Sequence, residues 1–252
     1  MCTMVILRRP AAAWPLIIGA NRDEMLDRPW LPPGRHWPER PGVTAGLDQL
    51  GLGTWLGINH AGVVAGILNR EGTLGPAVGL RSRGELVLAA LGHPDALAAA
   101  EAMATIDPRD YRPFNLVIAD REHAFCLYHR STQRPHLTAE SIGAGLSMIT
   151  AHDLNDRNDS RIRLYLPQFE EATQPEPERD DWREWEDLLA SHLWVDDAGP
   201  KGAMCFSTPS GFGTGSGSLI AVAGSPESKP SALWRFAAGP PGRVPWRDVV
   251  LG

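Results

Sequence analysis

The chain begins Met1-Cys2-Thr3-Met4-Val5-Ile6-Leu7, and this stretch decides the fold that we expect. The apolar run after Cys2 contains Val and Ile, which favour strands, so we predict a strand that starts directly after the cysteine. Cys2 is small enough for a methionine aminopeptidase to remove Met1, which would leave a free α-amino group on Cys2. A thiol with an ordinary pKa of about 8.5 would then stand beside an amine with a pKa of about 7.7–8.0.

A cysteine with a free α-amino group holds a nucleophile and a general base in one residue. This is the chemistry of an N-terminal-nucleophile (Ntn) hydrolase. The alternative interpretation is structural, because free cysteine is among the most buried residue types and can simply begin a core strand. The position of Cys2 alone does not distinguish the catalytic interpretation from the structural one, so the residues that follow are needed.

Composition and charge limit the classes of function. The 252 residues are 43% hydrophobic, and no long linker interrupts them, so we expect one domain over residues 1–252 with an ample core. The net charge is −6 without a dominant basic stretch, which argues against nucleic-acid binding. No apolar run reaches the ~18–20 residues of a membrane span, and the N-terminus does not resemble a signal peptide.

The cysteines and histidines indicate no metal site. The three cysteines lie far apart without a CxxC spacing, which excludes a disulfide framework and indicates a reducing compartment. The eight histidines are scattered and form no i,i+4 pair on a predicted helix. We therefore expect a soluble cytoplasmic protein that binds no metal and requires no cofactor, although any one histidine could ligate a bound haem.

Apolar runs and turn signals predict an order of strands, then helices, then more strands. Such an order fits antiparallel sheets packed with helices, an α+β fold, rather than a βαβ repeat. Ser82 and Glu85 form a capping-box pattern before the first predicted helix. The predicted strands are Thr3–Arg9, Leu16–Asn21, Thr54–Asn59, Val63–Asn69, Phe114–Ala119, Ala124–His129, Ile142–Thr150, Ala203–Thr208, Ser218–Ala223 and Leu233–Ala237. The predicted helices are Arg83–Leu91, Asp95–Thr105, Ser160–Glu171 and Asp181–Leu193, and Asp27–Pro41 is expected to be irregular.

Four polar residues, Asn21-Arg22-Asp23-Glu24, follow the second predicted strand without a gap. If the first two strands pair as a hairpin, the end of the second lies beside the start of the first, and Arg22 and Asp23 become neighbours of Cys2. An arginine there would lower the pKa of the thiol, and an aspartate could orient the α-ammonium group. The alternative is a solvated strand end.

These residues resemble the NRDE family, the family of the eukaryotic transport-and-Golgi-organisation protein 2 and its bacterial relatives. The resemblance is strong over residues 1–150 and weaker afterwards. It implies an Ntn-hydrolase-like four-layer αββα sandwich of two antiparallel sheets, with Cys2 in the position of the nucleophile. The motifs that carry it are Met1-Cys2, Asn21-Arg22-Asp23-Glu24, Arg28-Pro29, Gly46-Leu47-Asp48, Gly53-Thr54-Trp55-Leu56-Gly57-Ile58, Ser82-Arg83-Gly84-Glu85-Leu86-Val87 and Phe114-Asn115-Leu116-Val117-Ile118-Ala119-Asp120.

The segment from Asn59 to Asn69 also resembles the cholylglycine hydrolase and penicillin V acylase group. That resemblance implies Asn69 as a donor in an oxyanion hole, the alternative being a strand-end Asn that satisfies turn amides. Two departures weaken the match. Many NRDE relatives carry Asn at the position of Met148 and Arg at the position of Gly215. If that Asn is an oxyanion donor in the relatives, this chain either lacks the donor or supplies it from elsewhere, for which Asn155 is the candidate. We expect the Gly/Ser-rich segment around Gly215 to be a flexible hairpin, the alternative being a turn whose backbone N–H groups approach a ligand anion.

Two classes of function remain open. In the first, a hydrolase of an amide or thioester uses Cys2, Arg22, Asp23 and Asn69 for catalysis, with Asn21, Glu24, Arg28 and Trp55 near the bound molecule. In the second, a binding or carrier protein on the same scaffold holds a small amphipathic anion such as haem or an acyl-CoA, in an apolar groove lined by Trp30, Trp37 and Trp55 and rimmed by Arg22, Arg28 and Arg35. A scaffold role, by analogy with the family name alone, has no physical support in the sequence.

Overall fold

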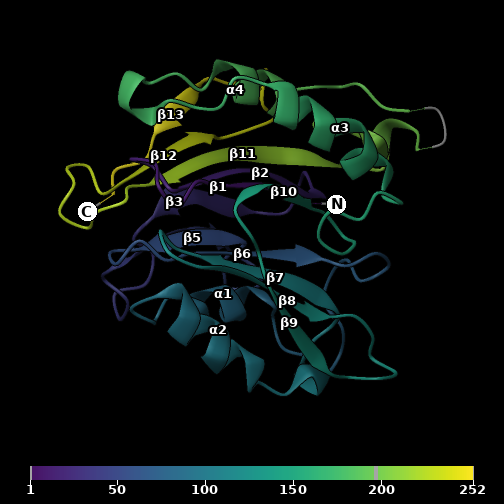
Figure 1. Ribbon diagram of the computed structural model, residues 1–252. Coiled ribbons are helices and arrows are strands. Elements are labelled where there is room, and N and C mark those ends of the chain that lie inside the picture. Colours follow the sequence, from purple (N-terminus) through teal and green to yellow (C-terminus); the bar gives the residue numbers. More distant parts are fainter. Residues whose placement is uncertain (1, 196–197, 252) are drawn as a thin grey trace.

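Two β-sheets lie face to face, and each is covered on its outer face by two helices (Figure 1). This computed structural model describes residues 2–195 and 198–251. In Figure 1, α3 and α4 cover one sheet and α1 and α2 cover the other, so the layers follow the order α, β, β, α. The predicted α+β sandwich of two antiparallel sheets is therefore confirmed.

Every pairing between named strands is antiparallel. Sheet A has the order β10-β1-β2-β11-β12-β13, and sheet B has the order β3-β4-β5-β6-β7-β8-β9. The strands are β1 (Thr3–Arg8), β2 (Leu16–Met25), β3 (Trp30–Gly34), β4 (Val43–Asp48), β5 (Leu56–Asn59), β6 (Val64–Asn69), β7 (Phe114–Ala119), β8 (Ala124–His129), β9 (Leu137–Ser141), β10 (Gly145–Ile149), β11 (Phe212–Val222), β12 (Ala232–Ala237) and β13 (Trp246–Asp248). The helices are α1 (Gly84–Ala90), α2 (Ala96–Ala104), α3 (Ser160–Glu171) and α4 (Arg183–Leu189).

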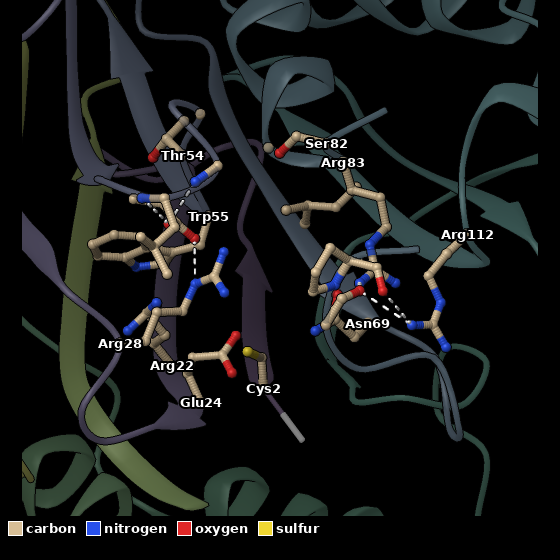
Figure 2. Close-up of a pocket in the computed structure, with 18 of the residues that line it drawn as sticks. Cys2, Arg22, Glu24, Arg28, Thr54, Trp55, Asn69, Ser82, Arg83 and Arg112 are labelled. Atoms are coloured by element: carbon tan, nitrogen blue, oxygen red, sulfur yellow. Dashed lines mark hydrogen bonds and ion pairs between the residues drawn. The ribbon is translucent and has the colours of Figure 1, made fainter. Parts of the chain in front are cut away.

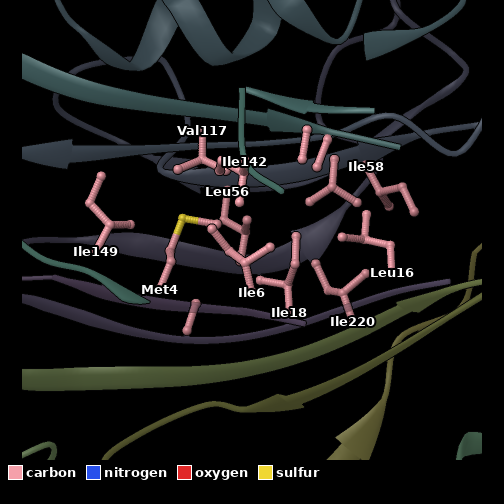
Figure 3. Packing of buried hydrophobic residues seen from close by; sticks show 14 of the residues in the cluster. Met4, Ile6, Leu16, Ile18, Leu56, Ile58, Val117, Ile142, Ile149 and Ile220 are labelled. Carbon is pink, nitrogen blue, oxygen red and sulfur yellow. The ribbon is translucent and has the colours of Figure 1, made fainter. Parts of the chain in front are cut away.

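The alternation of side chains along β1 and β2 divides the core into layers, because successive residues of a strand point to opposite faces. Met4 and Ile6 point between the sheets, where they meet Leu16 and Ile18 from β2 and residues of sheet B (Figure 3). The residues between them, such as Val5, pack against α3 and α4 instead. By the same alternation, Cys2 lies on the inter-sheet side, and it packs against that central cluster.

Several predicted elements are confirmed, among them the strands Phe114–Ala119 and Ala124–His129 and the helix Ser160–Glu171. The second predicted strand is too short. It continues through Asn21-Arg22-Asp23-Glu24 to Met25, because β11 pairs with it along this whole length. The polar tetrapeptide is therefore part of a central strand and not a solvated strand end.

The Gly/Ser-rich segment around Gly215 is also a strand and not a flexible hairpin, since it forms the first half of β11 beside β2. The predicted strand Ala203–Thr208 is wrong, because that segment forms only an isolated bridge between Ser207 and Gly213. Within the segment predicted to be irregular, Trp30–Gly34 pairs with β4 as the edge strand β3. β9 was not predicted, because its largely exposed residues lack an apolar pattern.

The capping box expected at Ser82 does not form. Arg83 occupies the cap position of α1 without a side-chain hydrogen bond to the helix. The carboxylate of Glu85 instead accepts a hydrogen bond from the hydroxyl of Tyr111 at 2.5 Å and pairs with Arg81 at 2.7 Å. Among the described helices, none is long and apolar enough to cross a membrane.

The loop between β4 and β5 packs tightly on the start of α1. A Cβ atom added to Gly53 would lie 2.5 Å from the carbonyl carbon of Gly84, and the Thr54 amide donates to the Gly84 carbonyl at 3.2 Å. A side chain larger than hydrogen cannot occupy this space unless the backbone moves. This contact therefore joins the loop that carries Trp55 to the start of α1, directly after Arg83.

We predict that Gly53→Ala destabilises the protein by about 1–3 kcal/mol, because the added methyl group overpacks a contact between two backbones. Thermal and urea unfolding would measure the change. Gly143→Ala is the matched control, since a Cβ atom at Gly143 meets nothing within 4 Å. Equal unfolding midpoints for the two variants would show that the contact is not tight.

Candidate functional site

The pairing of β1 with β2 brings Cys2 and Arg22 together. Thr3 faces Asn21 in the ladder, so Cys2, one residue earlier, lies beside Arg22, one residue later. The hairpin expected from the sequence thus forms. Arg22 and Glu24 share the inter-sheet face with Cys2, because Leu16, Ile18 and Ala20 on the same strand belong to the inter-sheet core.

The other two residues of the tetrapeptide point to the opposite face, toward the helices. The side-chain amide of Asn21 donates to the carbonyl of Leu189, the last residue of α4, at 2.8 Å and to that of Met204 at 2.9 Å. The carboxylate of Asp23 accepts from the hydroxyl of Thr214 at 2.8 Å. Asn21 therefore anchors the segments of the helix layer, and its side chain does not reach the cleft.

Arg161 on α3 is a site residue that the sequence did not indicate. Its guanidinium pairs with the carboxylate of Asp23 at 2.9 Å, and these side chains are 1% and 0% exposed. The same guanidinium donates to the hydroxyl of Thr3 at 2.6 Å and to the carbonyl of Lys201 at 2.6 Å. An arginine in the first turn of an amphipathic helix normally faces water, so no sequence signal could have identified this partner.

A pocket of about 370 Å³ opens at the end of the sandwich where Cys2 lies (Figure 2). Strands of both sheets, the start of α1 and the loop before α1 contribute to it. It brings together the predicted residues Cys2, Arg22, Asp23, Glu24, Arg28, Trp55 and Asn69, and it adds Arg81, Arg83 and Arg112. Asn21, Arg35, Trp30 and Trp37 are not among the residues that line it, and the two tryptophans pack against the core clusters instead.

Cys2 is half-buried and its thiol donates a weak hydrogen bond to the backbone carbonyl of Asp23, with the sulfur 3.6 Å from the oxygen. Burial raises the pKa of the Cys2 thiol, and the negative charge of Asp23 raises it further. Arg22 acts in the opposite direction, as expected from the sequence, but its effect is smaller. The lowering expected from Arg22 is therefore present, but burial and Asp23 outweigh it, and the pKa of the thiol is raised.

Arg22 and Arg28 form one wall of the pocket with the indole of Trp55. The guanidinium of Arg22 lies over the Trp55 ring, 4.6 Å from its centroid, and the side chain is buried. Removal from water lowers the pKa of Arg22, because burial penalises the charged form. Arg28 is neutralised by Asp48 at 2.8 Å. On the opposite wall, Asn69 ends β6, and no side-chain hydrogen bond joins it to another described residue.

A small recess of about 20 Å³ continues from Cys2 between the sheets. Its lining includes Ser216 and Ser218 from β11 and Arg22 from β2. A space of this size is sufficient for about one water molecule when polar groups are present. The Gly/Ser-rich segment thus contributes hydroxyl groups next to the thiol, in addition to its backbone pairing.

The two departures from the family pattern differ in their position. Met148 is fully buried on the helix side of sheet A, and Asn155 accepts from its backbone amide at 2.8 Å. Neither residue lines the pocket, so the structure gives no support to Asn155 as a replacement donor. Gly215 lies at a bulge in β11, where an added Cβ atom would be 3.9 Å from a guanidinium nitrogen of Arg22.

We predict that Arg161→Met costs about 3–5 kcal/mol of stability, because it removes the buried guanidinium that pairs with the carboxylate of Asp23. Chemical unfolding followed by far-ultraviolet circular dichroism would measure it. Arg183→Met is the control, since Arg183 is 83% exposed and pairs with Asp181 in water, where an ion pair contributes under about 1 kcal/mol. A loss no greater than that of the control would contradict the structural role of the buried pair.

Three solved structures share this fold. An N-acylethanolamine-hydrolyzing acid amidase orthologue from Caenorhabditis elegans superposes with a TM-score of 0.61 at 13% identity, covering 91% of this chain and 96% of that one. Penicillin V acylase from Agrobacterium tumefaciens gives 0.53 at 12% identity, covering 99% and 86%. A variant of the conjugated bile acid hydrolase from Clostridium perfringens gives 0.54 at 10% identity, covering 99% and 92%. These neighbours have the Ntn-hydrolase fold, so the likeness establishes the fold expected from the sequence.

No curated protein matches the sequence. The sequence model of the family described as Transport and Golgi organisation 2 matches residues 1–201, which is most of the chain. The match includes the N-terminal Cys2, the tetrapeptide in β2 and all of sheet B. The chain therefore belongs to the Transport and Golgi organisation 2 family, the NRDE family, and has an Ntn-hydrolase-like fold.

Proposed function

We infer that this protein is an N-terminal-nucleophile hydrolase that cleaves an amide or thioester bond through Cys2 after removal of Met1. The single observation that carries the proposal is the position of Cys2 beside Arg22, at the start of a central strand and on the surface of a 370 Å³ pocket. The structural neighbours include an amidase and a conjugated bile acid hydrolase by their own descriptions, and their scaffold is the one found here. The pocket is wide enough for a small substrate.

In the proposed reaction, the free α-amine of Cys2 takes the proton of the thiol, and the sulfur attacks the carbonyl carbon. A carbon–sulfur bond forms, and the carbonyl oxygen becomes an oxyanion that accepts a hydrogen bond from the amide of Asn69. Collapse of this intermediate breaks the bond to the leaving amine or thiol, which receives the proton. Water then hydrolyses the acyl-cysteine. Asp23 has a positioning role, because its carbonyl receives the thiol and its carboxylate is bound to Arg161.

Because the pKa of the thiol is raised, attack by the sulfur needs a base close by, and in this scheme the free α-amine of Cys2 is that base. Three unpaired cysteines are what a reducing compartment maintains, so we place the reaction in the cytoplasm.

The first test is the intact mass of the protein purified from its own host. We expect the loss of one methionine residue, and we expect brief incubation with acyl amides or acyl thioesters, quenched in acid, to add an acyl mass to Cys2. Cys2→Ala should reduce turnover at least about a thousandfold while the unfolding midpoint stays near that of the wild type. Retained Met1, or full turnover by the Cys2→Ala protein, would contradict the proposal that Cys2 is the nucleophile of an Ntn hydrolase.

The pH dependence of Cys2 follows from its surroundings. Because its pKa is raised, we expect alkylation by iodoacetamide to accelerate with increasing pH, with a midpoint above that of a free thiol. Arg22→Met should move the midpoint higher still, since it removes a cation that favours the thiolate. Mass spectrometry of the N-terminal peptide over a pH series would measure both. A midpoint that falls in Arg22→Met would contradict this account of the site.

A second candidate is a non-catalytic carrier of haem or an acyl-CoA. It is favoured by the same protonated thiol, which is a poor nucleophile if Met1 is retained, and by a pocket that combines Trp55 and Ile67 with several arginines. Titration of micromolar protein with hemin and with a long-chain acyl-CoA distinguishes the candidates. Saturable binding without turnover supports a carrier. If neither hemin nor the acyl-CoA binds, both are excluded as ligands.

A further inference from the structure

The charges that line the pocket do not balance. Of its arginines, Arg28 is paired with Asp48 at 2.8 Å, and Arg81 is paired with Glu85 at 2.7 Å. Three others, Arg22, Arg83 and Arg112, form no ion pair with a carboxylate in the part of the chain that the structure describes. Glu24 is the lining carboxylate left to oppose them, since that of Asp23 is held by Arg161 on the far face of β2.

Arg83 and Arg112 lie together on the wall opposite Arg22, with Asn69 beside them and Cys2 across the pocket (Figure 2). The guanidinium of Arg83 donates to the hydroxyl of Thr73 at 3.0 Å and to the carbonyl of Pro113 at 2.9 Å. That of Arg112 donates to carbonyls of the 70–81 loop, among them Leu74 at 2.8 Å. All these acceptors are neutral, so neither guanidinium is paired directly with a carboxylate among the described residues.

Arg112 is close enough to Arg83 for its charge to act on the Arg83 guanidinium. Burial lowers the pKa of Arg83 to about 10, and repulsion by the charge of Arg112 is the next largest cause. Two guanidinium groups that are half-buried and repel each other are normally held together by an anion. Hydrogen bonds to carbonyls keep them in position, but each guanidinium has five N–H groups and can also bind an anion.

We propose that Arg83 and Arg112 form an anion-binding subsite for a carboxylate or phosphate group on the molecule whose carbonyl carbon reaches Cys2. The substrate class is then an acyl amide or acyl thioester that carries a negative charge at a distance from the bond that is cleaved. Only the link to a carbonyl rests on the function proposed above, since the subsite itself needs no catalysis. Neutral acyl compounds would leave both cations without a partner and should be poor ligands.

Two alkylating reagents of nearly equal size test the subsite without any turnover. Iodoacetamide is neutral and iodoacetate carries a carboxylate, and with each the Cys2 thiolate forms a carbon–sulfur bond as iodide leaves. The ratio of the two rates, iodoacetate over iodoacetamide, cancels differences in thiolate fraction and in access to the pocket. Cys126 and Cys205 are buried, so mass spectrometry of the N-terminal peptide isolates Cys2.

We expect this ratio to exceed that of N-acetylcysteine about tenfold or more at low salt, because a cationic cleft concentrates anions by about 10–10³. It should decrease as the salt concentration rises. Arg83→Met and Arg112→Met should each lower the ratio about threefold to tenfold. Arg109→Met should leave it unchanged, since Arg109 is exposed, pairs with Asp107 and is outside the pocket.

A ratio in the wild type equal to that of N-acetylcysteine would overturn the proposal, and this measurement requires no variant to fold. If Arg83→Met unfolds, Arg83→Lys gives the comparison, because lysine keeps the charge but loses the planar fork. A partial loss is then expected. Protection of Cys2 against iodoacetamide by inorganic phosphate or by succinate identifies which anion is bound, and protection by neither also overturns the proposal.

If the ratio of the iodoacetate rate to the iodoacetamide rate is high and no turnover occurs, the anion-binding subsite is supported and the hydrolase function is contradicted. If turnover occurs equally on charged and neutral acyl compounds while the ratio matches that of a free thiol, the hydrolase stands and the subsite fails. The two proposals therefore have separate outcomes.

Discussion

The ion pair between Asp23 and Arg161 is the interaction on which the site depends. It joins a residue in the middle of sheet A to a helix that packs on that sheet, and it is fully buried at 2.9 Å. A buried pair contributes little net stability compared with apolar residues of the same volume, but the loss of one member is costly. The main contribution of this ion pair is to hold neighbouring segments in place. It ties together β1 through Thr3, β2 through Asp23 and β11 through Thr214 at the point where Cys2 enters the sheet.

The electrostatics of the pocket have two opposing parts. Burial and the charge of Asp23 keep the Cys2 thiol protonated, while the arginines that line the walls favour anions. A thiol that is uncharged at rest does not bind to those arginines itself, so they remain accessible to a ligand. If the α-amine of Cys2 is free, the proton can move within the residue only when a carbonyl group arrives. The charge on the sulfur would then develop next to Arg22, whose guanidinium stacks on Trp55.

The α+β class of the fold could be predicted because strands and helices leave local signals in the sequence, whereas the four-layer order came from the family resemblance. Alternation in the N-terminal strand, apolar hairpins and amphipathic helices each indicated an element, and most are present. Local sequence patterns did not predict the extent of strands that depends on pairing with distant segments. β2 continues through four polar residues because β11 lies beside it, and nothing within those residues indicates that neighbour. The contributions of Arg161, Arg83 and Arg112 depend on contacts between segments far apart in the chain, and composition alone would place each arginine in water.

Adjacent residues of the tetrapeptide in β2 serve different layers, since Asn21 and Asp23 hold the helices while Arg22 and Glu24 face the cleft. The packing role and the pocket role therefore alternate from one residue to the next along this strand. Substitutions of Arg22 and Glu24 would change the pocket without touching the helix layer, while substitutions of Asn21 and Asp23 would disturb the packing of that layer. A one-residue insertion anywhere between β1 and this element that shifted the strand register would exchange the two sets at once, placing a carboxylate beside the thiol and an arginine against the helices.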